Sequence, residues 1–296
     1  MIARGYVIIA LVCAIAAPAE AGVLLVRAKG TQIDEAVAAV KAELGAAVTS
    51  EMTVDEATSP AAVQDRAAAN DLVIAVGARA AQLAVQQRAI PVVHCMVLQD
   101  AGAFDTDRSV GVPLAVSARA RIDAVKRVVP SARKIGVLYD PRVNARALEE
   151  LEVSAKSAGM QLVKAKVGSS TDAPAALDML LPKIDALLVI PDATVVTKQL
   201  VTFLVARAFD KKLPVVAFSE ALVRVGALAA LAPRYADNGK LCARLAKRVL
   251  AGEKPAELRG VVEMPGALVV NSATARKIGV TLSAEVLRAP TQVVGN

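Results

Sequence analysis

The sequence predicts an α/β protein made of two Rossmann-like lobes with parallel sheets, joined by a hinge. Short apolar runs alternate with amphipathic stretches through most of the chain. Nearly continuous apolar runs are typical of strands that are buried on both faces of a parallel sheet. The alternation forms two successive series with no low-complexity linker between them. We therefore expect two sheets that share several crossing segments, and not two tethered domains.

Composition restricts the class of ligand and partner. The chain has 296 residues, of which 55% are hydrophobic, so it can build two ordinary cores. Only 2% of the residues are aromatic and none is Trp, which argues against a ligand site lined by a cage of rings. The formal net charge is +7, but the Lys and Arg residues are scattered along the predicted helices. This distribution predicts a soluble basic surface and no nucleic-acid partner.

The first 21 residues, "MIARGYVIIALVCAIAAPAEA", have the pattern of a secretory signal peptide. Arg4 supplies the positive start, and the apolar stretch 6–17 is too short to span a bilayer comfortably. Ala19-Glu-Ala21 fits a cleavage site, so we expect a periplasmic mature chain that starts at Gly22. A retained membrane anchor and a lipid on Cys13 are the alternatives. The lipid is disfavoured because Val12 stands where a small residue is normally required.

The first series begins directly after this leader. Thr31 and Ser59 are favoured N-cap residues, and Pro60 stands where a missing N–H costs nothing. Gly77 ends the third apolar run. The predicted strands are 22–28, 47–53, 71–77 and 90–96, and the predicted helices are 31–44, one starting at 60 and one starting near 79.

The second series repeats the pattern with longer helices. Gly159 is a typical helix stop, and each helix is followed by another apolar run. The predicted helices are 117–129, 144–158, 173–181 and 194–210, and the predicted strands are 134–140, 160–167, 185–192 and 213–219.

The C-terminal part departs from this rhythm. A run of small residues at 226–231 leads into an amphipathic helix at 235–251, where apolar residues recur every four positions, and Gly252 ends it. A strand at 267–271 and a short helix follow. A bare strand and a helix entry so close to the Ser219-Glu220 pair indicate that the chain passes between lobes there, beside a ligand.

Several motifs in this part resemble the ABC-transporter substrate-binding family described by its tryptophan- and tyrosine-type members. The matching residues are Ser219, Gly226 to Ala229, Tyr235, Gly239, Gly252 to Pro255, and the segments "IGVLYDPRVNA", "VIPDATVV" and "LVVNSATARKIGVTLSAEVLRAP". The match is strong over about 130–296 and weak over 22–116. There, His94-Cys95-Met96 stands where the family has Asp-Pro, and "RAKGTQID" replaces the usual first loop.

The resemblance implies the type I periplasmic-binding-protein architecture, with a ligand in the cleft between the lobes. On that template 22–116 and 234–260 form the first lobe, and 117–233 and 261–296 form the second. It also implies an exported solute-binding component of an ABC uptake system, with an ABC permease in the inner membrane as partner. The alternative is a periplasmic sensor or interaction module that keeps the fold without transport. A cytoplasmic repressor of this fold is disfavoured by the predicted signal peptide.

Polar residues at the strand ends are the candidate ligand contacts, because open α/β sheets bind ligands at the carboxyl ends of their strands. Backbone amides after Gly77 and the Arg79 guanidinium suit a carboxylate, while Asp192 and Glu220 suit an ammonium group. We therefore expect a small amino-acid-like solute. The plainer alternatives are that Asp192 caps a helix and that Arg79 is solvated. The full set is Lys29, Thr31, Gly77, Ala78, Arg79, His94, Tyr139, Asn144, Asp192, Thr194, Ser219 and Glu220.

No catalytic pattern accompanies these residues. His94 is the only His, so no metal site is expected. It neighbours Cys95, but neighbours in a strand point to opposite faces and do not form a nucleophile–base pair. We expect no enzyme and no cofactor. Cys95 and Cys242 are expected to be free thiols, with a disulfide as the alternative, because the sequence does not determine their separation.

Overall fold

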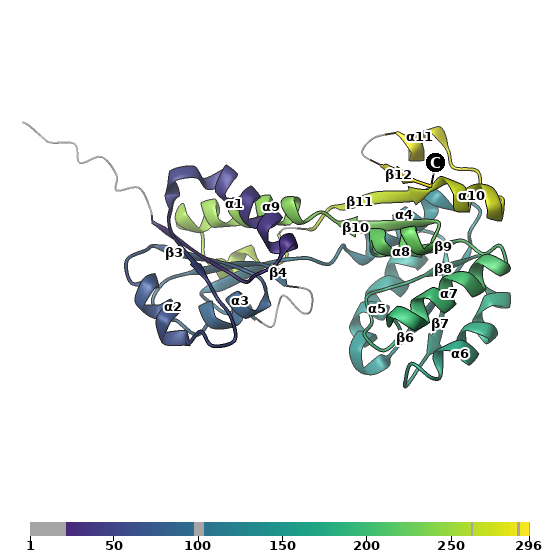
Figure 1. Ribbon diagram of the computed structural model, residues 1–296, viewed down its shortest axis with the longest axis horizontal. Helices are drawn as coiled ribbons and strands as arrows, with labels where there is room; N and C mark the ends of the chain where they lie inside the picture. Colours follow the sequence, from purple (N-terminus) through teal and green to yellow (C-terminus); the bar gives the residue numbers. More distant parts are fainter. Residues whose placement is uncertain (1–21, 98–103, 262, 289–290, 296) are drawn as a thin grey trace, which may run out of the picture.

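The chain folds into two α/β lobes, each built around its own sheet (Figure 1). The computed structural model describes residues 22–97, 104–261, 263–288 and 291–295, so the predicted signal peptide at 1–21 lies outside the described residues. One sheet has five strands in the order β2-β1-β3-β4-β5, and the other has seven in the order β12-β11-β10-β9-β8-β6-β7. The predicted fold class is confirmed.

The sheet of the first lobe is parallel throughout. Alternate residues of its strands point to opposite faces, and both faces are covered, which explains the continuous apolar runs. Helices α1 and α9 cover one face, and α2 and α3 cover the other. The elements are β1 (Val23–Arg27), α1 (Thr31–Leu44), β2 (Val48–Thr53), α2 (Pro60–Ala67), β3 (Leu72–Val76), α3 (Ala78–Ala84), β4 (Val92–Val97), β5 (Ser109–Pro113) and α9 (Tyr235–Leu250).

The sheet of the second lobe is parallel except where β10 pairs with β11. Helices α4, α5 and α10 cover one face, and α6, α7 and α8 cover the other. Its strands are β6 (Lys134–Tyr139), β7 (Gln161–Lys166), β8 (Ala186–Leu188), β9 (Val215–Ala217), β10 (Ala229–Pro233), β11 (Gly266–Asn271) and β12 (Gln292–Val294). Its helices are α4 (Ala118–Val128), α5 (Pro141–Ser157), α6 (Ala173–Leu180), α7 (Lys198–Asp210), α8 (Glu220–Val225), α10 (Ser272–Ile278) and α11 (Ala284–Leu287).

Some elements differ from the sequence prediction. Strand β5 was not predicted, because "SVGVP" is short and contains Gly and Pro. Helix α5 begins at Pro141 and not at Asn144, because Asp140 caps it. Strand β8 ends at Leu188, before a turn that delays α7 until Lys198.

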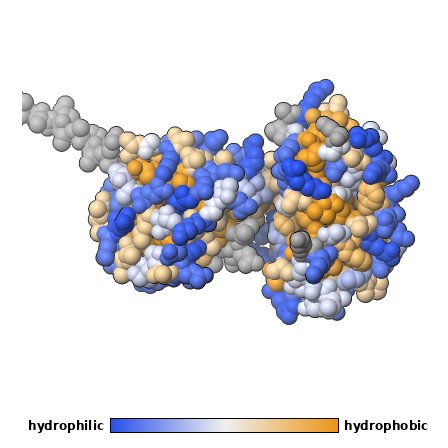
Figure 2. All heavy atoms as spheres, viewed as in Figure 1, coloured by the Kyte–Doolittle hydropathy of each residue, from blue (hydrophilic) through white to orange (hydrophobic). Residues whose placement is uncertain are grey.

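The chain passes between the lobes in three segments that pack side by side. The first follows β5, the second joins β10 to α9, and the third leads into β11. Val116 of the first segment forms a parallel bridge to Met264 of the third, and Pro233 pairs with Gly266. Gly266 is required here because a Cβ would overlap the Leu231 side chain. Figure 2 shows the two lobes as separate masses, with hydrophilic and hydrophobic residues interspersed on this face of both. The residues at which the lobes divide (116/117, 233/234 and 260/261) stay a prediction.

The directions of these crossings bring the carboxyl edges of both sheets toward each other. The chain leaves the first lobe from the carboxyl end of β5 and leaves the second from the carboxyl end of β10 (Figure 1). Both strands are parallel to the sheet neighbours that precede them. The ends of the other parallel strands therefore open toward the space between the lobes, where ligands of such sheets bind.

None of the helices in the described ranges is long and apolar enough to span a membrane.

Helix α9 returns to the first lobe and packs closely on α1. Gly239 allows this approach, because a Cβ at that position would overlap the carbonyl oxygen of Ala36 in α1. The contact matters because, in the described structure, α9 is the α-helix that the second passage of the chain adds to the core of the first lobe.

We predict that Gly239→Val lowers the free energy of unfolding by about 2–3 kcal/mol, because the added atoms force α1 and α9 apart. Chemical denaturation followed by circular dichroism measures this. The control is Gly168→Ala, where the new Cβ meets only Asp172 at an ordinary 3.5 Å. Equal stability of the Gly239 variant and the wild type would contradict the packing described here.

Candidate functional site

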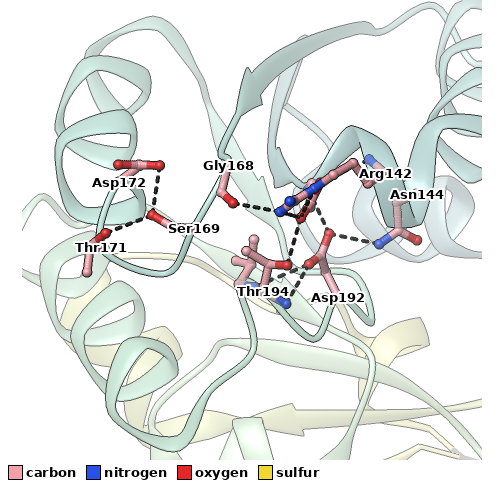
Figure 3. Close-up of polar contacts among 10 residues, drawn as sticks. Arg142, Asn144, Gly168, Ser169, Thr171, Asp172, Asp192 and Thr194 are labelled. Carbon is pink, nitrogen blue, oxygen red and sulfur yellow. Dashed lines mark hydrogen bonds and ion pairs between the residues drawn. The ribbon is translucent and has the colours of Figure 1, made fainter.

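Two buried carboxylates, Asp140 and Asp192, lie close together at the second-lobe edge, beyond β6 and β8. Figure 3 shows Asp192 beside Arg142, Asn144 and Thr194. The backbone N–H of Asp140 donates to Asp192 Oδ2 at 2.8 Å. The same oxygen accepts from Asn144 Nδ2 at 2.8 Å, while Oδ1 accepts from the amides of Thr194 (2.9 Å) and Val195 (3.2 Å). All of the usual acceptor positions of Asp192 are occupied, so this carboxylate joins the loops that follow the two strands.

Asp140 is neutralised by an arginine of its own helix. Its carboxylate caps α5 by accepting from the Arg142 amide (2.9 Å) and binds the Arg142 guanidinium through Nε (3.0 Å) and Nη2 (2.6 Å). The Thr194 hydroxyl also donates to it at 2.9 Å. These bonds, those from Arg142 first, hold the pKa of the Asp140 carboxyl well below its usual range. The carboxylate stays charged at any physiological pH.

The loop after β7 is attached to the same network. Arg142 Nη2 donates to the carbonyl oxygen of Gly168 at 2.6 Å. Beyond it, the Ser169 hydroxyl donates to Asp172 Oδ2 (2.8 Å) and contacts the Thr171 hydroxyl (2.7 Å), as Figure 3 shows. Three consecutive strand ends of the second lobe are thus tied into one preorganised edge.

The first-lobe edge has a different character, since it presents two uncapped helix starts. Gly30 precedes α1 and Gly77 precedes α3, and neither supplies a side chain to the first-turn amides. Gly77 has φ +103°, and a Cβ there would press on Ala28 and Ile33 at 3.0 and 3.1 Å. Both Thr31 and Ala78 are exposed. Free amides at a helix start favour an anion.

Arg79 does not point freely into solvent. Its guanidinium donates to the carbonyl oxygens of Asp55 (3.2 Å), Glu56 (3.2 Å) and Thr58 (3.1 Å), and to Gln82 Oε1 (2.9 Å). It therefore holds the loop after β2 beside the start of α3, and its charge stays at this edge. Lys29 lies on the same edge and is exposed, 3.9 Å from the Asp55 carboxylate.

His94 lies inside the lobe, away from the strand ends. It is fully buried, its Nε2 is 3.0 Å from Asp105 Oδ1, and its ring packs edge-on against Phe104. Gly111 of β5 makes room for it, because a Cβ there would overlap the ring. The sequence prediction ended this strand at Met96, but β4 continues to Val97. His94 is therefore an internal residue of the strand, and the structure does not bring it to the other candidates.

Asn238, which the sequence analysis did not select, links this edge to the crossing segments. Its Oδ1 accepts from the Met96 amide at 2.8 Å, and its Nδ2 donates to the carbonyl oxygen of Pro113 at 3.1 Å. Met96 has φ +59°, a left-handed conformation that is uncommon for such a residue, and the pairing of β4 with β5 shifts there. Asn238 could have been found from the sequence as a polar residue on the otherwise apolar, buried face of α9.

The remaining candidates end strands of the second lobe. Tyr139 is the last residue of β6 and is buried in the core. Ser219 is the N-cap of α8, but its side chain makes no cap bond. Glu220 pairs with Arg224 and accepts from Gln292 Nε2 at 3.1 Å; within the described residues these bonds all go to Oε1.

The geometry suits binding. Open helix starts with Lys29 and Arg79 lie on one edge, and carboxylates and hydroxyls lie on the opposing one. Among the described residues there is no group of three or more His, Cys, Asp and Glu side chains that could hold a metal ion. Two hinged α/β lobes with facing carboxyl edges define a two-lobed binding protein of the type I periplasmic-binding-protein architecture.

The family model for ABC transporter substrate binding proteins matches residues 16–294. The chain belongs to this family of substrate-binding proteins, which is not an enzyme family. The expected resemblance is therefore confirmed, including over the first lobe, where its motifs were weak.

Individual relatives agree with this assignment. A tyrosine-binding protein of Clostridioides difficile (strain R20291) is 28% identical over 159 residues, which is 53% of this chain and 46% of that protein. The match therefore spans about half the length of that relative. Two solved structures share the fold. The ABC domain in complex with L-Trp from Streptococcus pneumoniae is 23% identical with a TM-score of 0.58, covering 92% of this chain and 100% of that one. The ligand-free, open structure of a substrate binding protein with adhesive properties from Clostridium difficile is 20% identical with a TM-score of 0.75, covering 93% and 99%.

We predict a pH-dependent role for Arg142. In the unfolded chain the pKa of the Asp140 carboxyl is about 3.9. Because the pKa is lower in the folded protein, the ionised carboxylate stabilises the fold above about pH 4, and this stabilisation is lost as the pH falls toward the folded pKa. In Arg142→Met this contribution shrinks. The difference in free energy of unfolding between wild type and variant should be largest near pH 7 and narrow below pH 4, as measured by denaturation from about pH 7 to pH 3.

The control for this prediction is Arg207→Met, which breaks the exposed pair with Asp178 (2.8 Å). Its effect should stay below about 1 kcal/mol at neutral pH, because exposed ion pairs contribute little. A difference for Arg142→Met that stays constant over the whole pH range would contradict the assignment.

Proposed function

We propose that the protein is the exported solute-binding component of an ABC uptake system and binds a small amino-acid-like solute between its lobes. The observation that carries this proposal is the pair of facing, polar carboxyl edges on hinged lobes in a chain of the substrate-binding family. Closure of the lobes over a solute removes it from water on both sides, without any chemistry. An ABC permease in the inner membrane is the proposed partner.

The carboxylate of the solute is proposed to bind the first lobe. The uncapped starts of α1 and α3 offer amides, and the Arg79 charge adds a favourable field although its donors are engaged by carbonyl oxygens. Transfer of a carboxylate from water into a buried site without such donors would cost at least several kcal/mol of free energy. The proposed contacts on this edge are Lys29, Thr31, Gly77, Ala78 and Arg79.

The ammonium group of the solute is proposed to face the second lobe. Glu220 is the better partner, because its Oε1 takes the bonds from Arg224 and Gln292 and its second oxygen remains for the ligand. Asp192 has its acceptor positions occupied and acts as the support of the edge. The proposed set on this edge is Tyr139, Asn144, Asp192, Thr194, Ser219 and Glu220.

The names of the relatives support an amino acid. One relative is a tyrosine-binding protein, and one structural neighbour holds L-Trp. The low aromatic content of this chain means that an aromatic ring of the solute would pack mainly on aliphatic side chains. The sensor or interaction module is kept as the second candidate, because the first loop "RAKGTQID" and His94-Cys95-Met96 depart from the family pattern.

We predict that L-tyrosine and L-tryptophan bind, and that tyramine, which lacks the carboxylate, binds far more weakly. Arg79→Ala should weaken binding of the amino acids by about 1 kcal/mol, because it removes a positive charge near the carboxylate and not a hydrogen bond to it. Isothermal titration calorimetry measures both effects. The control is Arg66→Ala, an exposed arginine of the same lobe that donates to the Glu51 carbonyl oxygen at 3.2 Å. Equal affinity for tyramine and L-tyrosine would exclude the carboxylate site. Binding of an amino acid without uptake by cells would favour the sensor.

Export makes a separate prediction about the first residue of the mature chain. The Gly22 backbone nitrogen donates to Asp71 Oδ2 at 2.8 Å, so cleavage after Ala21 would place a positive amino group on that carboxylate. We expect N-terminal sequencing of protein from the periplasmic fraction to start at Gly22. Recovery of an intact Met1, or of a lipid on Cys13, would contradict this.

A further inference from the structure

The two cysteines of the described chain lie together in the core of the first lobe. Cys95 is on β4 and Cys242 is on α9; both are fully buried, and both belong to the same hydrophobic cluster. Both are free thiols in the structure. Their proximity was not predicted, since nothing in the sequence determined how α9 docks. A hydrogen bond between the thiols and their burial raise the pKa of the Cys242 thiol.

The backbone explains why the two side chains face each other. Asn238 lies one helical turn before Cys242, so both point from the same face of α9. The Asn238 side chain reaches the Met96 amide, the residue next to Cys95. The irregular pairing at Met96 turns Cys95 and Met96 toward the same core. The Asn238–Met96 hydrogen bond holds α9 against the end of β4, so the strand and the helix are near each other where the two cysteines lie.

We propose that Cys95 and Cys242 form a redox pair that closes into an intramolecular disulfide when the chain folds in an oxidising compartment. The oxidant is another disulfide, either glutathione disulfide or the disulfide of an exchange catalyst. One cysteine thiolate attacks it and releases one thiol. The second cysteine thiolate then attacks the mixed disulfide and releases the other. Two cysteine thiols become one disulfide, and the oxidant is reduced to two thiols.

The bond would close a loop of about 150 residues that contains most of the second lobe. It would join the two passages of the chain through the first lobe and fix α9 against β4. The Cys95 carbonyl oxygen accepts from the Gly77 amide at 2.9 Å, so the crosslink would also stiffen the ligand-facing edge. Because the docked thiols are buried and the Cys242 pKa is raised, oxidation would occur during folding, before α9 covers β4.

The test compares the full chain refolded with glutathione disulfide and with a reductant. Free thiols are alkylated under denaturing conditions, and peptide mapping by mass spectrometry assigns each cysteine, so Cys13 is read separately. We expect a peptide linked through Cys95 and Cys242 after oxidative refolding. Reduction should lower the Tm by roughly 5–10 °C, given typical disulfide contributions and a chain of this size.

The double variant Cys95→Ala/Cys242→Ala should show no such response to reductant. If that variant does not fold, the proposal is decided by the peptide mapping of the wild-type protein and by the difference in Tm between its oxidised and reduced forms. Alkylation of both cysteines after oxidative refolding, or disulfide-linked dimers, would overturn the proposal. The claim that the bond forms in an oxidising compartment rests on the proposed export, but the outcome of the refolding experiment does not depend on it. A pair that oxidises in vitro and is recovered reduced from cells would support the redox pair and contradict the export.

Discussion

Because the three chain crossings pack against one another, both sheets are held with their carboxyl edges facing. The bridge between Val116 and Met264 and the antiparallel pairing of β10 with β11 join the segments. Asn238 connects these segments to the end of β4 and to Pro113 at the end of β5. The candidate residues of the two lobes face each other because of this arrangement. If the crossings were a flexible tether, the same side chains would lie on two independent surfaces.

The two edges are built in different ways. In the second lobe, Asp140, Asp192 and Arg142 tie together the loops after β6, β7 and β8 through bonds between nearby groups. In the first lobe, the starts of α1 and α3 have no side-chain cap within the described residues, and Arg79 holds the loop after β2. The second-lobe edge is therefore a satisfied hydrogen-bond network, and the first-lobe edge offers the amides to which the proposed anionic group would bind.

Much of the fold could be predicted from the sequence because its signals are local. Strands β1, β3 and β4 are mainly apolar and buried on both faces, and Gly159 or Gly252 stops a helix whatever surrounds it. Strand β5 was missed because it contains Gly111, a residue that is uncommon in strands. This glycine makes room for the His94 ring of a neighbouring strand, a contact that the local sequence does not reveal. The antiparallel direction of β11 also depends on where the third crossing returns.

The candidate site was less predictable because hydrogen-bond partners are distant in the sequence. Asp192 was selected as a strand-end carboxylate, but its donors include Asp140, the N-cap of α5, and Asn144 in the first turns of α5. Arg79 was selected for its charge, yet its carbonyl partners follow β2. Sequence spacing identifies which residue types reach an edge. It does not show whether their bonding capacity is already used, and that decides between a ligand contact and a structural support.

The distribution of charge over the two edges supports the proposed binding of a zwitterion between the lobes. The first-lobe edge carries Lys29, Arg79 and two helix N-termini, all favouring negative charge. On the second, Asp192 binds only neutral donors in the described structure, so its negative charge is not neutralised by an adjacent cation. The proposed solute, with a carboxylate at one end and an ammonium at the other, would be attracted to both edges in one orientation. It would contact both edges only when the lobes approach, so on this proposal its binding energy would favour the closed state over the open one. A ligand of a single charge would be held by one edge and opposed by the other, which would leave the hinge without a net drive to close.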